Sequence, residues 1–176
     1  MVNAGVPFIR STNIVNGVLS DKELVYLSDS KHLELKKGHL RTGDVLITNR
    51  GEIGKVALVD ERFNNANLNS QIAWLRCNQD IKNEYLLFFL MSEKMKSFYR
   101  DTKTGAALQQ LPIGKIEKIV IPVPDFAYQT KRCLDFRLIQ QYAESAKNSY
   151  SRKNRELRLL NQSILQQAFN GELVKD

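Results

Sequence analysis

The sequence of 176 residues has no run of about 18 apolar residues, which a membrane-spanning helix needs. Its first residues lack the basic start and apolar middle of a signal peptide, so we expect a cytoplasmic protein. The two cysteines, Cys77 and Cys133, lie too far apart to indicate a disulfide framework, and we expect reduced thiols in or near the core. The two histidines, His32 and His39, have no cysteine partner at zinc-finger spacing, so we expect no metal site.

Catalytic motifs are missing as well. Gly51–Lys55 resembles part of a phosphate loop, but its spacing differs from GxxxxGK[ST] and no Ser or Thr follows the lysine. We interpret it as a tight turn between two strands. The sequence contains no GxSxG, HExxH or CxxC, no segment typical of amino-methyltransferases, and no acidic cluster that could hold a nuclease metal. We therefore expect no catalytic activity in this chain.

The chain divides near Pro122 and Pro124. Before them, short apolar runs alternate with Gly and Asn turns, whereas no Pro or Gly occurs from Phe126 to Phe169, where we expect one long helix ending at Gly171. The predicted fold is α+β, with a mixed or antiparallel sheet in residues 1–125, the helix in residues 126–170 and a tail in residues 171–176. Strands are expected at residues 8–10, 13–15, 45–48, 55–59, 72–76 and 116–123, and one core-packed helix over about residues 84–99, capped by Asn83.

The long helix carries a seam whose members alternate three- and four-residue steps, the heptad signature of a helix that pairs with another. Its members are Ile139, Ala143, Ala146, Tyr150, Lys153, Leu157, Leu160, Ile164 and Gln167. The seam is polar near residues 149–154. A helix of about 43 residues reaches roughly 65 Å, much longer than a domain of this size is wide. We therefore expect pairing outside the domain, through a second copy or another protein, rather than folding back onto the domain.

The formal net charge of +7 favours nucleic acid as a partner, because cationic side chains neutralise phosphates. Side chains that read base edges or bind phosphate gather in expected loops, although each group taken alone is better explained as an ordinary solvated loop. The candidates for DNA contact are Arg10, Ser11, Asn13, Lys36, Lys37, Arg41, Asn49, Arg50, Lys55, Asn67, Asn69, Gln71, Lys103, Thr104, Gln109 and Gln110.

Short motifs follow one another along nearly the whole chain. In order, they are GVPFIRSTNI at residues 5–14, GDVLIT at 43–48, GEIGK at 51–55, YL at 85–86, GAALQQL at 105–111, IPVP at 121–124 with Gln129, and AFNGEL at 168–173. These motifs resemble those of the specificity subunits of type I restriction-modification systems. No single motif is specific, but their order is. The chain is similar to a half-length form, with one target-recognition domain and one conserved helix.

The resemblance implies that the chain recognises double-stranded DNA without catalysing a reaction. In such systems modification subunits methylate adenine with S-adenosylmethionine, and restriction subunits translocate and cut DNA with ATP and Mg. A full-length specificity subunit has two recognition domains separated by two antiparallel helices. For this chain, the resemblance implies a prokaryotic, cytoplasmic homodimer whose paired helices set the gap in a bipartite site, with Ile139, Ala143, Ala146, Tyr150, Leu157, Leu160 and Ile164 at the dimer interface.

Two features depart from the family pattern. The family usually has two to three dozen residues before the GxPxIR strand, so we expect the recognition domain to lack a helix or an edge strand. Ala106 and Ala107 replace the usual hydroxyl residue of the Gly-x-x-Gln loop, which weakens the expectation that this loop contacts DNA. An alternative therefore stays open, in which the chain is a regulatory interaction module that sequesters modification or specificity subunits.

Overall fold

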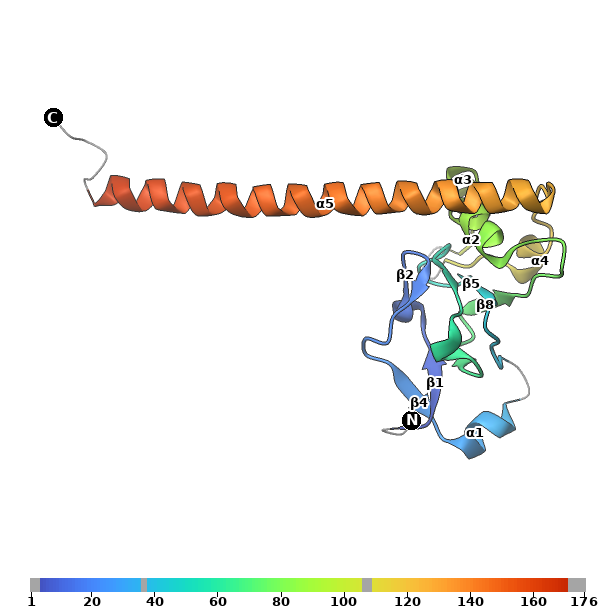
Figure 1. Ribbon diagram of the computed structural model, residues 1–176. Coiled ribbons are helices and arrows are strands. Elements are labelled where there is room, and N and C mark those ends of the chain that lie inside the picture. The colour runs from blue at the N-terminus through green and yellow to red at the C-terminus, as the bar shows by residue number, and fades with distance from the viewer. Residues whose placement is uncertain (1–3, 36–37, 106–108, 171–176) are drawn as a thin grey trace. The chain divides into compact units, whose positions relative to one another are not determined.

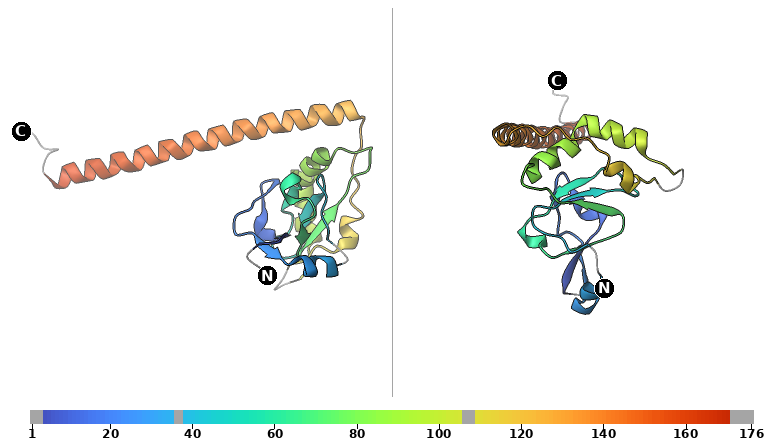
Figure 2. Two further views of the ribbon diagram at one scale, coloured as in Figure 1. Left: turned by 60° about the horizontal axis from the view of Figure 1, so that its bottom comes forward. Right: turned by 90° about the vertical axis from the view of Figure 1, so that its right-hand side faces the viewer.

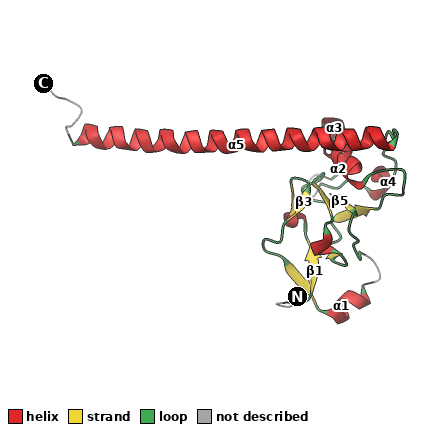
Figure 3. Cartoon of the chain, viewed as in Figure 1, coloured by secondary structure: helices red, strands yellow, loops and turns green. Residues whose placement is uncertain are grey.

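The computed structural model describes residues 4–35, 38–105 and 109–170. It contains short strands and helices followed by one long helix (Figures 1 and 3), which confirms the predicted α+β class. The strands are β1 (Val6–Ile9), β2 (Ile14–Val15), β3 (Val18–Leu19), β4 (Val25–Leu27), β5 (Val45–Thr48), β6 (Val56–Leu58), β7 (Asn67–Leu68) and β8 (Ile72–Leu75). The helices are α1 (Asp29–Glu34), α2 (Asn83–Met91), α3 (Glu93–Thr102), α4 (Ile113–Ile116) and α5 (Phe126–Phe169), with 3-10 turns at Ser11–Asn13 and Glu61–Phe63.

Contacts divide the chain into two compact units, Met1–Cys133 and Leu134–Asp176. Helix α5 covers the predicted range, and its first two turns belong to the first unit. The predicted cap at Gly171 lies outside the described residues. Among the described helices, none combines the length and apolarity that crossing a bilayer requires.

Strand β5 is the centre of the first unit. It pairs antiparallel with β6 on one side and β8 on the other, and all four of its residues are buried. Successive side chains of a strand point to opposite faces. Leu46 therefore contributes to one core, whereas Val45 and Ile47 contribute to a second core with residues of α2 and α3. Figure 2 shows α2 and α3 on one side of this sheet and β1 on the other.

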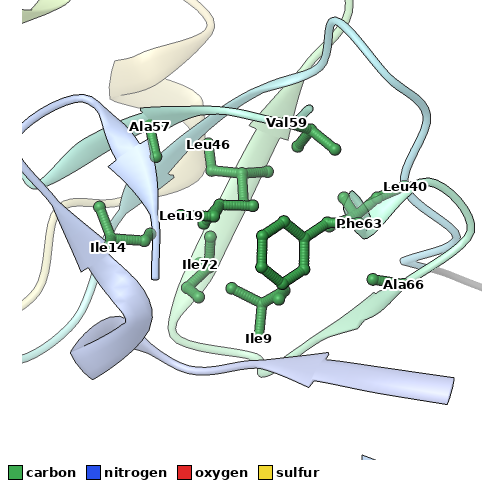
Figure 4. Packing of buried hydrophobic residues seen from close by; sticks show 10 residues of the cluster. All are labelled: Ile9, Ile14, Leu19, Leu40, Leu46, Ala57, Val59, Phe63, Ala66 and Ile72. Atoms are coloured by element: carbon green, nitrogen blue, oxygen red, sulfur yellow. The ribbon is translucent and has the colours of Figure 1, made fainter. Parts of the chain in front are cut away.

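The first core lies between this sheet and a second one, in the order β4-β1-β7. Strand β1 is antiparallel to β4 and parallel to β7. Figure 4 shows Phe63 in the middle of this core, beside Ile9 and Leu40. These side chains are at most 2% exposed, so each contributes about 1.5–3 kcal/mol of burial free energy.

The prediction of a single helix over residues 84–99 was wrong, because two helices, α2 and α3, occupy this part of the chain. The backbone is extended at Ser92 (φ −67°, ψ 157°), which ends α2 and begins α3. The Ser92 hydroxyl accepts a hydrogen bond from the Met95 N–H at 3.4 Å, as an N-cap does. The predicted cap at Asn83 was also wrong, because Lys82 occupies the N-cap position and Asn83 is the first helical residue. The break lets Leu90 on α2 and Met95 on α3 reach the same core.

The strand predicted at residues 116–123 was wrong too. Ile116 ends the short helix α4, and residues 117–125 form no strand. The alternation in the sequence is real, since Ile119 and Ile121 pack against the second core while Val120 is 84% exposed. Pro122 has no N–H to donate to a strand ladder. The alternating residues of this segment therefore serve to pack against the second core and not to pair with a strand. Similarly, Asn13 lies in a 3-10 turn and only residues 14–15 form the expected strand.

The structure gives a reason for Gln129, the residue that accompanies the IPVP motif at residues 121–124. Its side chain is fully buried in the first turns of α5. The Oε1 atom accepts a hydrogen bond from the Lys82 N–H at 2.8 Å, and Nε2 donates to the carbonyls of Asp80 at 2.9 Å and Pro124 at 2.8 Å. The amide thus holds the start of α2 and the proline segment together. Cys133, one helical turn further, is buried, and neither it nor Cys77 forms a disulfide, as predicted.

Candidate nucleic-acid interface

Residues 49–55 connect β5 to β6 and form the first part of the candidate interface. The loop is closed by hydrogen bonds of the Thr48 N–H to the Lys55 carbonyl at 2.9 Å and of the Gly54 N–H to the Thr48 carbonyl at 3.0 Å. The Thr48 hydroxyl donates to the Glu52 carbonyl and accepts from the Lys55 N–H. This confirms that Gly51–Lys55 belongs to a turn between two strands and not to a phosphate loop. The whole connection, residues 49–55, is seven residues long.

Backbone hydrogen bonds join this loop to a segment more than fifty residues later in the chain. The Gly51 N–H donates to the Gln109 carbonyl at 3.0 Å, and the Leu111 N–H donates to the Asn49 carbonyl at 2.8 Å. Residue 50 also forms a bridge with residue 110. The Lys103 ammonium donates to the Gln109 side chain at 3.0 Å. Two groups of predicted DNA-contacting residues are therefore neighbours in space.

A third and a fourth group meet at the same end of β5. The Asn49 N–H donates to the Gln71 carbonyl, and the Asn69 N–H donates to the Ile9 carbonyl, both at 2.9 Å. Residue 10 therefore lies beside residue 69, and residue 71 beside residue 49. We define the β5-end surface as Arg10, Ser11, Asn49, Arg50, Lys55, Asn69, Gln71, Lys103, Thr104, Gln109 and Gln110. Arg50, Thr104 and Gln109 are its exposed members, and Asn49 is buried.

Arg100, the basic residue in the last turn of α3, extends this surface. A hollow of about 210 Å³ is lined by Arg100 together with Ile53, Gly54, Lys96, Tyr99, Lys103 and Gln109. Tyr99 is buried, which raises its pKa, and its hydroxyl donates to the Leu90 carbonyl at 2.9 Å. Tyr99 therefore supports the surface from beneath without titrating near neutral pH.

Gly54 is required by the close approach of the loop to Tyr99. Its φ is +85°, and a Cβ atom there would lie 2.6 Å from Cδ2 of the Tyr99 ring. The substitution Gly54→Ala is therefore expected to lower the stability of the first unit by about 2–4 kcal/mol, from left-handed strain plus overpacking. The measurement is urea unfolding followed by fluorescence of Trp74, the only tryptophan.

Gly51→Ala is the matched control, because Gly51 has φ +72° in the same loop but no atom within 4 Å of its added Cβ. We expect this variant to lose only the backbone contribution, about 1–2 kcal/mol. Equal losses in the two variants would show that the contact with Tyr99 is unimportant.

Two of the predicted DNA-contacting residues are buried. Asn13 is fully buried; its Oδ1 accepts from the Arg10 N–H at 3.0 Å, and its Nδ2 donates to the carbonyls of Ser20 and Lys22. Asn67 is 1% exposed and hydrogen bonds to His32 and to the Gly38 carbonyl. Both amides therefore hold loops in place and are not available to base edges. Asn69 is intermediate, because its Oδ1 accepts from the Gln71 N–H while the residue stays partly exposed.

Arg41 lies at the opposite end of β5, where its carbonyl accepts a hydrogen bond from the Asp44 N–H in the turn that precedes the strand. A polar hollow there is lined by His39, Leu40, Arg41, Thr42, Glu61, Asn64, Asn65 and Arg76. The candidates Lys36 and Lys37 fall outside the described residues. The structure thus gathers most candidates at one end of β5 and leaves Arg41 apart from them.

Asp44 and Arg76 form an ion pair that the sequence did not reveal. Asp44 is 1% exposed, and its two carboxylate oxygens accept hydrogen bonds from Nε and Nη2 of Arg76 at 2.7 and 2.8 Å. This pairing raises the pKa of Arg76. The Arg76 guanidinium also lies 4.7 Å from the centre of the Trp74 ring. The aspartate of the GDVLI motif therefore fixes the start of β5 to the end of β8.

The predicted dimer-interface residues lie along α5 in the second unit. Ile139, Tyr150, Leu157, Leu160 and Ile164 are between 44% and 72% exposed. Ala143 and Ala146 are exposed as well. An uninterrupted helix with this much exposed aliphatic and aromatic surface is typical of an element that is covered by a partner.

Comparison with known proteins is consistent across sequence and fold. The family model described as type I restriction modification DNA specificity domain matches residues 2–136. The chain is 26% identical to the type I restriction enzyme EcoBI specificity subunit of Escherichia coli, and the match covers 98% of this chain and 36% of that protein. The chain thus spans little more than a third of this relative's length.

Two solved structures share the fold. One is a chain from a structural study of complex assembly and conformational transition of the type I R-M system, with a TM-score of 0.76, 20% identity, and coverage of 96% of this chain and 39% of that one. The other is the HsdS subunit from Thermoanaerobacter tengcongensis, with a TM-score of 0.66, 21% identity, and coverage of 97% and 39%. Since the family model covers most of the sequence, the chain belongs to the type I restriction-modification DNA specificity family.

Proposed function

We propose that this chain reads a DNA sequence for a type I restriction-modification complex and does so with the β5-end surface. The observation that carries the proposal is the hydrogen-bonded convergence of four chain segments, near residues 10, 50, 70 and 109, at one end of β5. Each segment alone is an ordinary polar loop. Together they present arginine, lysine and glutamine side chains on a surface that β5 and its two neighbours hold rigid.

The side chains of this surface suit two different tasks. Arg50 and Gln109 are exposed, and arginine and glutamine can pair with two atoms of guanine and adenine edges, respectively. Lys55 and Lys103 suit phosphate, which fixes the position of the protein on the duplex. The hydrogen bond between Lys103 and Gln109 orients the glutamine amide before DNA arrives. The proposal therefore assigns base reading to Arg50 and Gln109.

The remaining activities belong, in this proposal, to other subunits. The chain catalyses nothing itself and acts in the prokaryotic cytoplasm, where its DNA substrate is found. Modification subunits bring S-adenosylmethionine, and restriction subunits bring ATP and Mg and reach the chain through the modification subunits. This assignment rests on the family to which the chain belongs, because the chain matches only part of one subunit of a restriction enzyme.

We further propose that two copies of the chain pair through α5 and read a bipartite site. In an antiparallel pair centred near residue 151, Leu157 and Leu160 of one copy lie opposite Ala146 and Ala143 of the other. Large residues then face small ones in successive layers, which fills the seam evenly. A parallel pair would instead stack alanine on alanine, which leaves gaps. The antiparallel arrangement has two-fold symmetry and predicts an inverted repeat.

The test is the methylation pattern of genomic DNA in cells that co-express this chain with a modification subunit of its system. A methylated inverted repeat with a constant gap is the expected result. Two unlike half-sites would contradict the homodimer and indicate pairing with a different specificity chain. A stable complex without new methylation would contradict DNA reading and favour the alternative, a regulatory module that sequesters modification or specificity subunits.

A further inference from the structure

Helix α5 carries most of the net positive charge of this protein. It contains eight Lys and Arg residues against three Asp and Glu, a net +5 within 44 residues, whereas the whole chain has a net +7. The preceding 125 residues, which contain the β5-end surface, account for only +3, and residues 170–176 for −1. A helix that served solely to pair with a second copy of itself would not need this excess, because like charges oppose association.

The excess is concentrated in one short stretch. Arg152, Arg155 and Arg158 follow one another at three-residue spacing and are exposed. Arg152 lies 3.9 Å from Glu156, but both side chains are at least 65% exposed, so this pair is weak. Residues three apart are neighbours on a helix surface, so the three guanidinium groups form a ridge.

This ridge lies away from the apolar seam. In the heptad that places Leu157 and Leu160 at the seam, the three arginines occupy the outer positions b, c and f. They therefore remain accessible when the seam is covered. In the antiparallel pair proposed above, the ridges of the two copies lie within about 20 Å of each other along the middle of the pair, at 1.5 Å per residue.

The surroundings of the ridge favour a polyanion over a protein. From Gln141 to Arg158, every outer position carries Gln, Asn, Ser, Glu or Arg. The centre of a protein interface is apolar and depleted of charge, and these outer positions offer no apolar side chain before Leu159, at the end of the ridge. Duplex DNA instead presents about one negative charge per 1.7 Å of its axis. About 20 Å of duplex therefore offers more phosphates than the six arginines of the pair require.

We infer that Arg152, Arg155 and Arg158 bind the phosphates of the DNA gap between the two half-sites. This inference rests on the proposed function, because DNA must connect two recognition domains that the paired helices hold apart. The duplex then runs beside the helices, and its gap faces their middle. The contacts involve phosphates alone, so they contribute affinity and stiffness without adding recognised bases.

The experiment uses the full chain and a fluorescein-labelled 40-base-pair duplex of mixed sequence, with binding followed by fluorescence anisotropy from 50 to 200 mM KCl. The test variant combines Arg152→Gln, Arg155→Gln and Arg158→Gln. Each lost phosphate contact lowers the slope of log K against log salt concentration by about 0.9. The pair loses six such contacts, so we expect the slope to fall by about five. Glutamine is a good helix former, and circular dichroism should be unchanged.

A matched control removes the same charge elsewhere. Lys22, Lys115 and Lys118 are exposed residues of the first unit and lie outside the β5-end surface. Their combined replacement by glutamine should change the slope by less than about 0.5. An equal fall in test and control would mean that only net charge matters and would overturn the inference. An unchanged slope in the test variant, with loss of co-purifying modification subunit, would assign the arginines to an acidic protein surface instead.

A third variant separates this inference from the proposed function. Arg50→Gln combined with Lys103→Gln alters only the β5-end surface. If this variant lowers the salt slope and the helix variant does not, the proposed function survives and the inference about α5 fails. The opposite result supports the inference and counts against the β5-end surface. A flat salt response of the unaltered chain would overturn both.

Discussion

The double substitution Leu157→Lys and Leu160→Lys is expected to convert dimers of this chain into monomers. Both leucines are more than half exposed on α5 and belong to the seam. A two-fold pair would lose four leucine side chains, each worth about 1.5–3 kcal/mol when buried, and would gain ammonium groups in an apolar layer. The dissociation constant should therefore rise by at least about four orders of magnitude, as measured by light scattering over a dilution series.

The control uses the same chemistry on another face of the same helix. Leu159 and Leu165 are each 57% exposed, like Leu157, but lie outside the seam. Their replacement by lysine should leave the dimer intact. If the seam variant stays dimeric, the seam is misassigned. If the unaltered chain is already monomeric, two copies do not pair through α5, and the partner of the seam is another protein.

Replacing Asp44 by alanine is expected to cost about 2–3 kcal/mol of the unfolding free energy of the first unit. The substitution removes two hydrogen bonds to Arg76 and a third, of 2.8 Å, to the Arg41 N–H. Breaking a fully buried ion pair costs about 3–5 kcal/mol. The cost is smaller here because the Arg76 side chain is 35% exposed and can be hydrated. Urea unfolding followed by Trp74 fluorescence measures the loss.

Asp60 provides the matched control for Asp44. It also pairs with an arginine, Arg62, at 2.8 Å, but the two side chains are 42% and 60% exposed. Asp60→Ala should therefore cost only about 1 kcal/mol, because it loses a surface pair and the hydrogen bond that Asp60 accepts from the Arg62 N–H as an N-cap. Losses of similar size for the two variants would show that burial of Asp44 contributes little and that the start of β5 is held mainly by the backbone.

Local patterns were reliable wherever one physical effect dominated. The absence of Pro and Gly from residue 126 to residue 169 predicted the bounds of α5. The apolar run at residues 45–48 predicted β5 because four consecutive buried side chains need a strand covered on both faces. The prediction failed at Ser92, where a hydroxyl that caps the next helix competes with continuation of the first. It failed again at residues 117–125, where apolar and exposed residues alternate but the segment forms no strand.

The candidate interface also has some properties that the sequence predicted and others that only the structure showed. Composition identified asparagines as possible base readers, but burial decided that Asn13 and Asn67 support loops instead. Arg76 ends a strand-like run and carried no signal of its own, because its partner Asp44 lies 32 positions earlier. The residues of the β5-end surface could be named from the sequence. Their gathering at one end of β5 depends on hydrogen bonds between distant segments, which a linear pattern does not encode.

The sequence by itself determined the α+β class, the long helix with its seam, and the family to which the chain belongs. These properties depend on side-chain periodicity and on motif order, and both are local. Only the tertiary structure decided which polar residues are exposed, which loops adjoin one another, and which carboxylate holds the start of β5. Those outcomes depend on pairing across long stretches of chain, where burial and hydrogen-bond geometry select among residues that look equivalent in the sequence.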